Sequence, residues 1–153
     1  MELTYDNIVK WMKDYFEVYG KYGQEPDTFQ RMNDYFAPDL RFIPYIAGLG
    51  GPEGGFRSRD EFLRTAIAHT GWYEILTPLD ITVDERRKAV VVIFNIDVYD
   101  RKTRQVVVKR NAIAHYNLVL DDKKTIKIKT IRFFWETLPP GVKEFYEIFG
   151  REG

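Results

Sequence analysis

The chain has 153 residues, carries 23 basic and 23 acidic side chains, and contains no cysteine. Its length fits a single domain covering residues 1–153, and its balanced charge argues against nucleic-acid binding, which normally requires an excess of basic residues. Without cysteine, the chain can form neither a disulfide scaffold nor a cysteine-ligated zinc site.

Two helices are predicted at the start of the chain. Over residues 4–22, apolar positions recur at helical spacing, and Thr4 is suited to cap the first turn. The predicted buried face consists of Ile8, Met12, Tyr15, Phe16, Tyr19 and Tyr22. A shorter helix is predicted over residues 28–36, and the Ala37-Pro38-Asp39 segment ends it because proline disrupts a helix.

A short strand and a third helix follow. The strand covers residues 40–46, with Pro44 marking an edge or a bend. Residues 48–55 are rich in glycine but lack the Lys-Ser/Thr ending of a phosphate-binding loop, so we interpret them as a hinge or the rim of a pocket. Ser58-Arg59-Asp60-Glu61 has the pattern of a capping box and opens a helix that reaches residues 69–70.

The second half of the chain alternates between strands and turns. Strands are predicted over residues 73–83, 88–99, 106–120 and 125–137, and a short helix over residues 142–149. The last two strands form a long hairpin. Helices followed by a meander of strands predict an α+β fold in which a curved sheet wraps the helices.

Strand alternation assigns the residues of the hairpin to two faces. If Asp121 lies opposite Thr125, then Asn111, Ile113 and His115 share a face with Ile131, Phe133 and Trp135. A change of one residue in the turn would exchange the faces and bring Tyr116, Arg110 and Arg132 inward. Both faces are apolar, so both should be covered. We expect the helices to cover one face and a second copy of the chain to cover the outer face, giving a homodimer.

Three segments resemble the nuclear transport factor 2-like superfamily, also called SnoaL-like or cystatin-like. They are residues 35–42 (Tyr-Phe-Ala-Pro-Asp-Leu-Arg-Phe), residues 58–62 (Ser-Arg-Asp-Glu-Phe), and the closing strand with Ile131-Arg132-Phe133-Phe134-Trp135. The resemblance covers about residues 4–138. It implies a cone-shaped α+β barrel, whose strongly curved mixed or antiparallel sheet encloses a pocket, and a short C-terminal helix. Members include ketosteroid isomerases, scytalone dehydratases, polyketide cyclases, limonene epoxide hydrolases and many non-enzymes.

The resemblance implies that Trp135 faces the pocket, and the predicted register then places His115 there as well. Histidine titrates near neutral pH and suits acid–base catalysis; the alternative is a core histidine bonded to a neighbour. Tyr15 or Tyr45 would polarise a ligand oxygen. The other predicted ligand-binding residues are Tyr19, Phe62, Asn111, Ile113, Ile131, Phe133 and Trp135.

Other polar residues fit catalytic roles less well. The positions that correspond to the carboxylates of ketosteroid isomerases fall near Ile43-Pro44 and Ile113, which argues against that chemistry. Asp14 falls on the polar margin of the first helix, and Asp97 can pair with Lys109 on an exposed stretch. The two histidines have no carboxylate at metal-ligand spacing, so a metal site is not expected. No organic cofactor is implied either.

The predicted function is binding of a small apolar or aromatic molecule, with or without cofactor-free chemistry of the lyase or isomerase type. The alternative is a non-catalytic dimerisation or protein-interaction module with a filled core. The N-terminus lacks a secretion signal and no stretch approaches a membrane span, so a cytoplasmic protein with no membrane or nucleic-acid partner is expected. Residues 142–149 form either a lid or a dimer contact.

Overall fold

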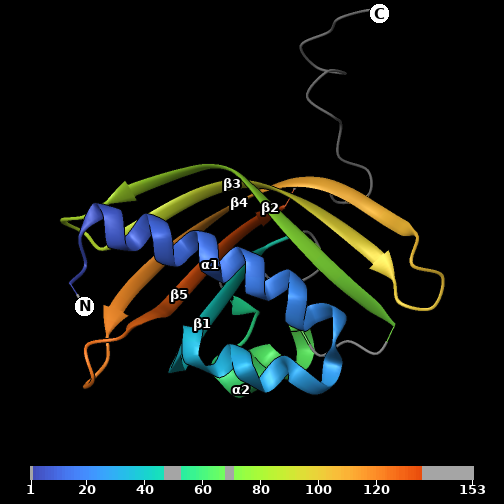
Figure 1. Ribbon diagram of the computed structural model, residues 1–153, viewed down its shortest axis with the longest axis horizontal. Coiled ribbons are helices and arrows are strands. Elements are labelled where there is room, and N and C mark those ends of the chain that lie inside the picture. Colours follow the sequence, from blue (N-terminus) through green and yellow to red (C-terminus); the bar gives the residue numbers. More distant parts are fainter. Residues whose placement is uncertain (1, 47–52, 68–70, 136–153) are drawn as a thin grey trace, which may run out of the picture.

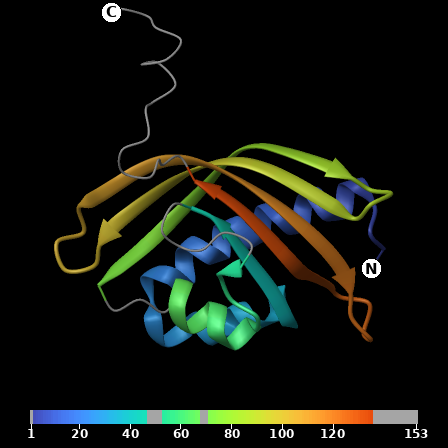
Figure 2. The same cartoon turned by 180° about the vertical axis from the view of Figure 1, so that it is seen from behind.

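A computed structural model describes residues 2–46, 53–67 and 71–135 of the chain. It has an α+β architecture, in which an N-terminal helical layer packs against a five-stranded mixed sheet. In spatial order, the strands are β1 (Phe36–Tyr45), β5 (Ile126–Trp135), β4 (Val106–Leu120), β3 (Ala89–Asp100) and β2 (Trp72–Asp84). β1 pairs with β5 in parallel and the other neighbours are antiparallel. The sheet arches over the helices, which lie on its concave side (Figure 1, Figure 2).

The first helix, α1, spans Tyr5–Gln24, close to the predicted bounds. Thr4 caps it as predicted, because its side-chain oxygen accepts a hydrogen bond from the backbone N–H of Asn7. Its buried face contains the predicted Ile8, Met12, Tyr15, Phe16 and Tyr19. The apolar spacing therefore identified both the helix and its inner face.

The other helical segments are short. A 3-10 helix, η1, covers Pro26–Tyr35. α2 covers Arg59–Phe62 and continues as a π-helical turn, η3, over Leu63–Ile67. Ser58 caps α2 as predicted, since its hydroxyl accepts from the N–H of Glu61 at 3.1 Å. The Glu61 side chain reaches back one residue further than in a capping box and accepts from the N–H of Arg57 at 3.2 Å.

The sheet differs from the prediction at its first strand. β1 begins at Phe36, so the segment around Pro38 that was predicted to separate helix from strand is itself extended. Proline is tolerated there because β1 is an edge strand, whose other side makes only an isolated bridge between Phe42 and Phe56 in the described part of the chain. Pro78 likewise lies on the opposite edge strand, β2, next to a register shift.

The sheet is open. β1 and β2 form its two edges and do not pair with each other in the described part of the chain, so the closed cone-shaped barrel expected from the sequence is not formed by these strands. The predicted helix over residues 142–149 lies outside the described residues.

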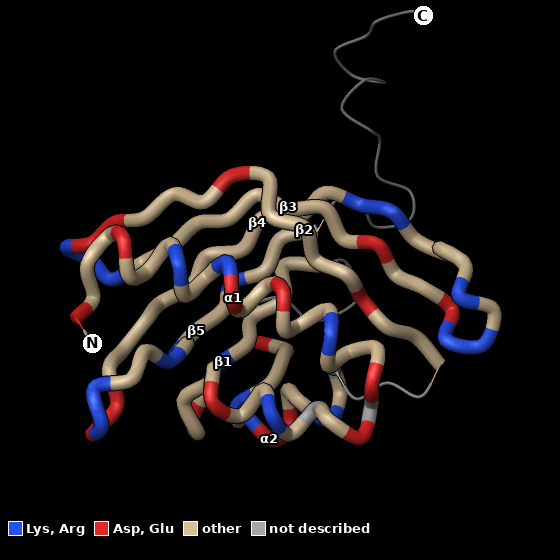
Figure 3. Tube along the Cα trace, in the orientation of Figure 1, with Lys and Arg blue, Asp and Glu red and all other residues tan. Residues whose placement is uncertain are grey.

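Charge is distributed without a dominant sign. Basic and acidic residues alternate along the chain and gather at its turns (Figure 3). None of the helices in the described ranges is long and apolar enough to cross a membrane. Within those ranges, no group of three or more His, Asp or Glu side chains is arranged to hold a metal ion.

Candidate functional site

One extra residue in β5 decides which side chains face the helices. The hairpin turn has the predicted length, with Asp121 donating its backbone N–H to the carbonyl of Thr125 at 3.0 Å. Leu118 then lies opposite Ile128, but Asn117 lies opposite Thr130. Lys129 is therefore a β-bulge, and it shifts the register by one beyond that point.

The bulge makes the predicted pairing wrong. The inner face joins Tyr116 to Ile131, Ala114 to Phe133 and Ala112 to Trp135. Of the three residues expected to turn inward in the exchanged register, Tyr116 is buried on this face. Arg132 stays on the outer face, where it lies opposite His115 and donates to the side-chain oxygen of Asn117 at 2.8 Å.

Four predicted site residues consequently lie on the outer face of the sheet, away from the helices. They are His115, Asn111, Ile113 and Tyr45. Tyr45 stacks on Phe134 with ring centroids 4.4 Å apart, and Ile113 is 44% exposed. His115 and Tyr45 are therefore not positioned to act together with Trp135.

His115 is half-buried and lies in an electropositive environment. Burial lowers the pKa of its imidazole, and the neighbouring charges of Arg132 and Arg87 lower the pKa further. Its Nδ1 is buried and makes no hydrogen bond within the described part of the structure. The residue is thus held neutral on the face opposite the aromatic core.

A cavity of about 350 Å³ lies between the inner face of the sheet and the helices. It is lined by Tyr15, Tyr19, Phe42, Ile46, Phe56, Phe62, Thr65, Glu74, Leu76, Phe94, Ile96, Tyr116, Ile131, Phe133 and Trp135. This volume falls in the range of ligand sites, roughly 300–1,000 Å³. Six residues predicted for the site line it, namely Tyr15, Tyr19, Phe62, Ile131, Phe133 and Trp135. Their roles in binding or catalysis stay predictions.

Glu74, on β2, is the one charged residue among the described lining residues of the cavity, and the sequence analysis did not select it. The Tyr19 hydroxyl donates a hydrogen bond to Glu74 Oε2 at 3.2 Å. Burial raises the pKa of Glu74 to about 7, although the bond from Tyr19 acts in the opposite direction. A carboxyl group that gains and loses its proton near neutral pH suits acid–base chemistry.

Two further phenols lie beside this pair. The rings of Tyr15 and Tyr116 are 6.0 Å apart at an interplanar angle of 74°. Burial raises the pKa of Tyr116, and a hydrogen bond with Tyr15 offsets part of that rise. Burial also raises the pKa of Tyr15. Both hydroxyls are therefore protonated at neutral pH and can act as hydrogen-bond donors.

Solved structures of other proteins share this architecture. An NTF2-like superfamily protein from Salmonella enterica serovar Typhimurium aligns with a TM-score of 0.61 at 16% identity, covering 94% of this chain and 100% of that chain. A protein from Nostoc punctiforme described as having a cystatin-like fold aligns with a TM-score of 0.59 at 12% identity, covering 93% and 100%. An LEH-like epoxide hydrolase from Mycobacterium tuberculosis aligns with a TM-score of 0.55 at 14% identity, covering 80% of each chain.

The chain has the nuclear transport factor 2-like fold. No family model matches the sequence, and no curated protein matches it. At these identities the likeness concerns the NTF2-like fold alone, so the chemistry has to be argued from the site.

Within this NTF2-like fold, Arg101 links β2, the strand that carries Glu74, to α1, the helix that carries Tyr19. Its Nη2 donates to the backbone carbonyls of Gly23 at 2.8 Å and Trp72 at 2.9 Å. Gly23 lies near the end of α1, and Trp72 begins β2. The contact between Glu74 and Tyr19 is therefore supported by a bond between their two elements.

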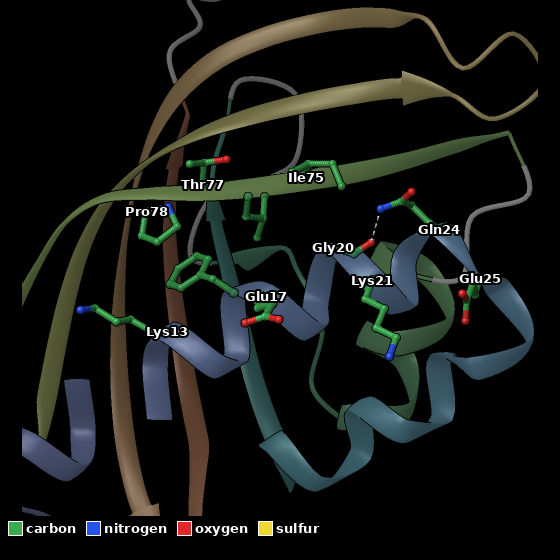
Figure 4. A pocket seen from close by; sticks show the side chains of 11 residues that line it. Lys13, Glu17, Gly20, Lys21, Gln24, Glu25, Ile75, Thr77 and Pro78 are labelled. Carbon is green, nitrogen blue, oxygen red and sulfur yellow. Dashed lines mark hydrogen bonds between the residues drawn. The ribbon is translucent and has the colours of Figure 1, made fainter. Parts of the chain in front are cut away.

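A second hollow lies along the outer side of α1, where the helix meets β2 (Figure 4). At about 470 Å³ it is larger than the cavity, but it is an open groove bordered by exposed charged side chains, including Lys13, Glu17 and Lys21. Such i, i+4 charges are typical of a solvated helix surface. The smaller cavity, which combines aromatic walls with the half-buried carboxyl group of Glu74, is the better candidate site.

Proposed function

We propose that the protein binds a small hydrophobic molecule in the cavity and that Glu74 exchanges a proton with it. The observation that carries the proposal is the Glu74 carboxyl group, which lies inside an aromatic cavity and has a pKa raised to about 7. Apolar walls with a few convergent polar groups are typical of ligand sites. The cofactor-free lyase or isomerase-type chemistry expected from the sequence is thus assigned to Glu74 in place of His115.

The roles of the tyrosines follow from their contacts. Tyr19 holds the Glu74 carboxylate through its 3.2 Å hydrogen bond, which makes it a positioning residue. Tyr15 and Tyr116 are hydrogen-bonded to each other, so one O–H of the pair would be left to donate to a ligand oxygen, and both phenols stay protonated at neutral pH. The fold offers a precedent for small-molecule chemistry, since one similar structure is described as an LEH-like epoxide hydrolase.

The proposal can be tested with a reaction that needs only a base in an apolar pocket. A nitrobenzisoxazole is a neutral aromatic molecule that loses a C–H proton to a base while its ring N–O bond breaks and a coloured phenolate forms. We expect saturable turnover by the wild-type protein, increasing with pH around an apparent pKa near 7. The Glu74→Gln variant should lose this activity.

His115→Gln provides the matched control. His115 lies on the outer face, so its replacement should leave the turnover unchanged. Equal rates in wild type and Glu74→Gln would refute the assignment to Glu74, and loss of rate in His115→Gln alone would restore the histidine hypothesis.

The outer face supports a second proposal, which is that the chain forms a homodimer through it. Ile93, Ile113 and Phe134 are 40%, 44% and 44% exposed, and Ile113 lies opposite both Ile93 and Phe134. They form a continuous apolar row across three strands, of the kind found at protein interfaces. A second copy presents the same row and can cover it symmetrically.

Sedimentation tests the dimer. Wild type should sediment as a dimer and Phe134→Asp as a monomer, whereas Leu79→Asp, at an exposed position on the β2 edge, should stay dimeric. A wild-type monomer at all concentrations would exclude the proposed interface.

A further inference from the structure

We propose that the molecule bound in the cavity carries a basic nitrogen, held as an ammonium group against the carboxylate of Glu74. This inference rests on the proposed function, because it specifies the ligand of the same site. It starts from the charge of the lining. Glu74 is the one acidic residue among the described lining residues, and they include no Lys, Arg or His.

Few protein groups stabilise the negative charge of the Glu74 carboxylate. Tyr19 supplies its one hydrogen bond within the described part of the chain. The causes that shift its pKa are burial and this bond, with no contribution from a neighbouring positive charge. Charges held away from water in proteins are normally paired, and Glu74 is half-buried, so the missing positive charge is most simply supplied by the ligand.

The aromatic side chains that line the cavity also suit a cationic ligand. Tyr15, Tyr19, Phe62 and Trp135 all line the cavity. Aromatic faces attract ammonium groups, most strongly where water is excluded. An anionic ligand would meet the negative carboxylate and the negative ring faces, and the described lining offers it no positive partner.

The proposal makes binding depend on pH in a defined way. The titratable groups that face Glu74 are the phenols of Tyr19, Tyr15 and Tyr116, and burial raises the pKa of each. They stay neutral below about pH 9. Acidification below the pKa of Glu74 therefore protonates the carboxyl group alone, and an ammonium ligand loses about tenfold in affinity for each further pH unit.

Three ligands with the same ring system separate the alternatives. Naphthylethylamine, naphthylethanol and naphthylacetate are titrated calorimetrically into wild type and Glu74→Gln at about pH 8, where Glu74 is ionised. In wild type we expect the amine to bind at least about tenfold more tightly than the alcohol, and the acetate most weakly. Glu74→Gln should remove the preference for the amine and keep binding of the alcohol. Glu17→Gln, a change in the open groove, should keep the preference.

Each outcome has a distinct meaning. Alcohol binding equal to or tighter than amine binding in wild type would overturn the basic nitrogen and leave the hydrophobic site standing. An amine preference that persists in Glu74→Gln would overturn the ion pair. Failure of all three ligands to bind would overturn the proposed function itself.

Discussion

Replacing Glu74 by glutamine should change how stability depends on pH. In the folded protein Glu74 keeps its proton up to about pH 7, whereas an exposed glutamate loses it near 4.5. Between these values the folded state binds more protons than the unfolded state, so the free energy of unfolding falls as pH rises. At roughly 1.4 kcal/mol per pKa unit, this shift corresponds to a loss of about 3 kcal/mol between pH 4.5 and 7. Above pH 7 both states are ionised and the loss stays constant.

Glutamine cannot ionise, so Glu74→Gln should escape this loss. Urea denaturation at a series of pH values gives the free energy of unfolding of each protein. The free energy of unfolding of the variant minus that of wild type should rise by about 3 kcal/mol from pH 4.5 to 7.5. In Glu17→Gln, at an exposed position on α1, the difference should stay flat. A flat difference for Glu74→Gln would show that Glu74 titrates like an exposed glutamate and would refute the reasoning.

Two further predictions concern Glu74's partner and a constrained loop. Tyr19→Phe removes the hydrogen-bond donor that lowers the pKa of Glu74. The midpoint of the pH–rate profile with nitrobenzisoxazole should therefore lie at a higher pH in this variant than in wild type. An unchanged midpoint would mean that this bond is absent in solution. Gly55 has a φ of 83°, and a Cβ there would lie 2.0 Å from the carbonyl oxygen of Phe42, so Gly55→Ala should cost more than about 2 kcal/mol of unfolding free energy. Gly71→Ala, with no atom within 4 Å of its new Cβ, should be nearly neutral in the same denaturation assay.

Much of the fold could be predicted because its signals are local. Apolar spacing over residues 4–22 and a threonine cap define α1, and both depend on neighbours within a few residues. The same holds for the Ser58 cap and for the hairpin turn at Asp121. The open edges of the sheet depend on which strands meet in space, and no local pattern reports this.

The faces of the hairpin could not be assigned from turn length alone. A bulge at Lys129 adds a residue to β5 but none to the turn, so strict alternation groups every β5 residue beyond it with the wrong face of β4. A signal was nevertheless present in the sequence. Buried isoleucines occur at 126, 128 and then 131, and this change from a spacing of two to a spacing of three is what a bulge produces.

Glu74 was missed for a different reason. β2 is an edge strand with mixed burial along its length, so alternation does not separate an inner from an outer side there. Its inward direction depends on Tyr19, which is 55 residues away in the sequence. A glutamate in such a strand looks like an ordinary surface residue until the helix that covers it has been placed.

The proposed acid–base site depends on both the bulge and the edge strand. The Lys129 bulge turns Ile131, Phe133 and Trp135 to the inner face, where they meet the face of β4 that carries Tyr116. His115 lies on the opposite face of β4, beside Arg132, and Glu74 has no positive partner among the described lining residues. Without a bound cation, this isolation keeps the carboxyl pKa raised, because a positive charge nearby would restore an ordinary value. The irregularity that defeats the simple register prediction therefore also supplies the aromatic wall of the cavity that contains this carboxyl group.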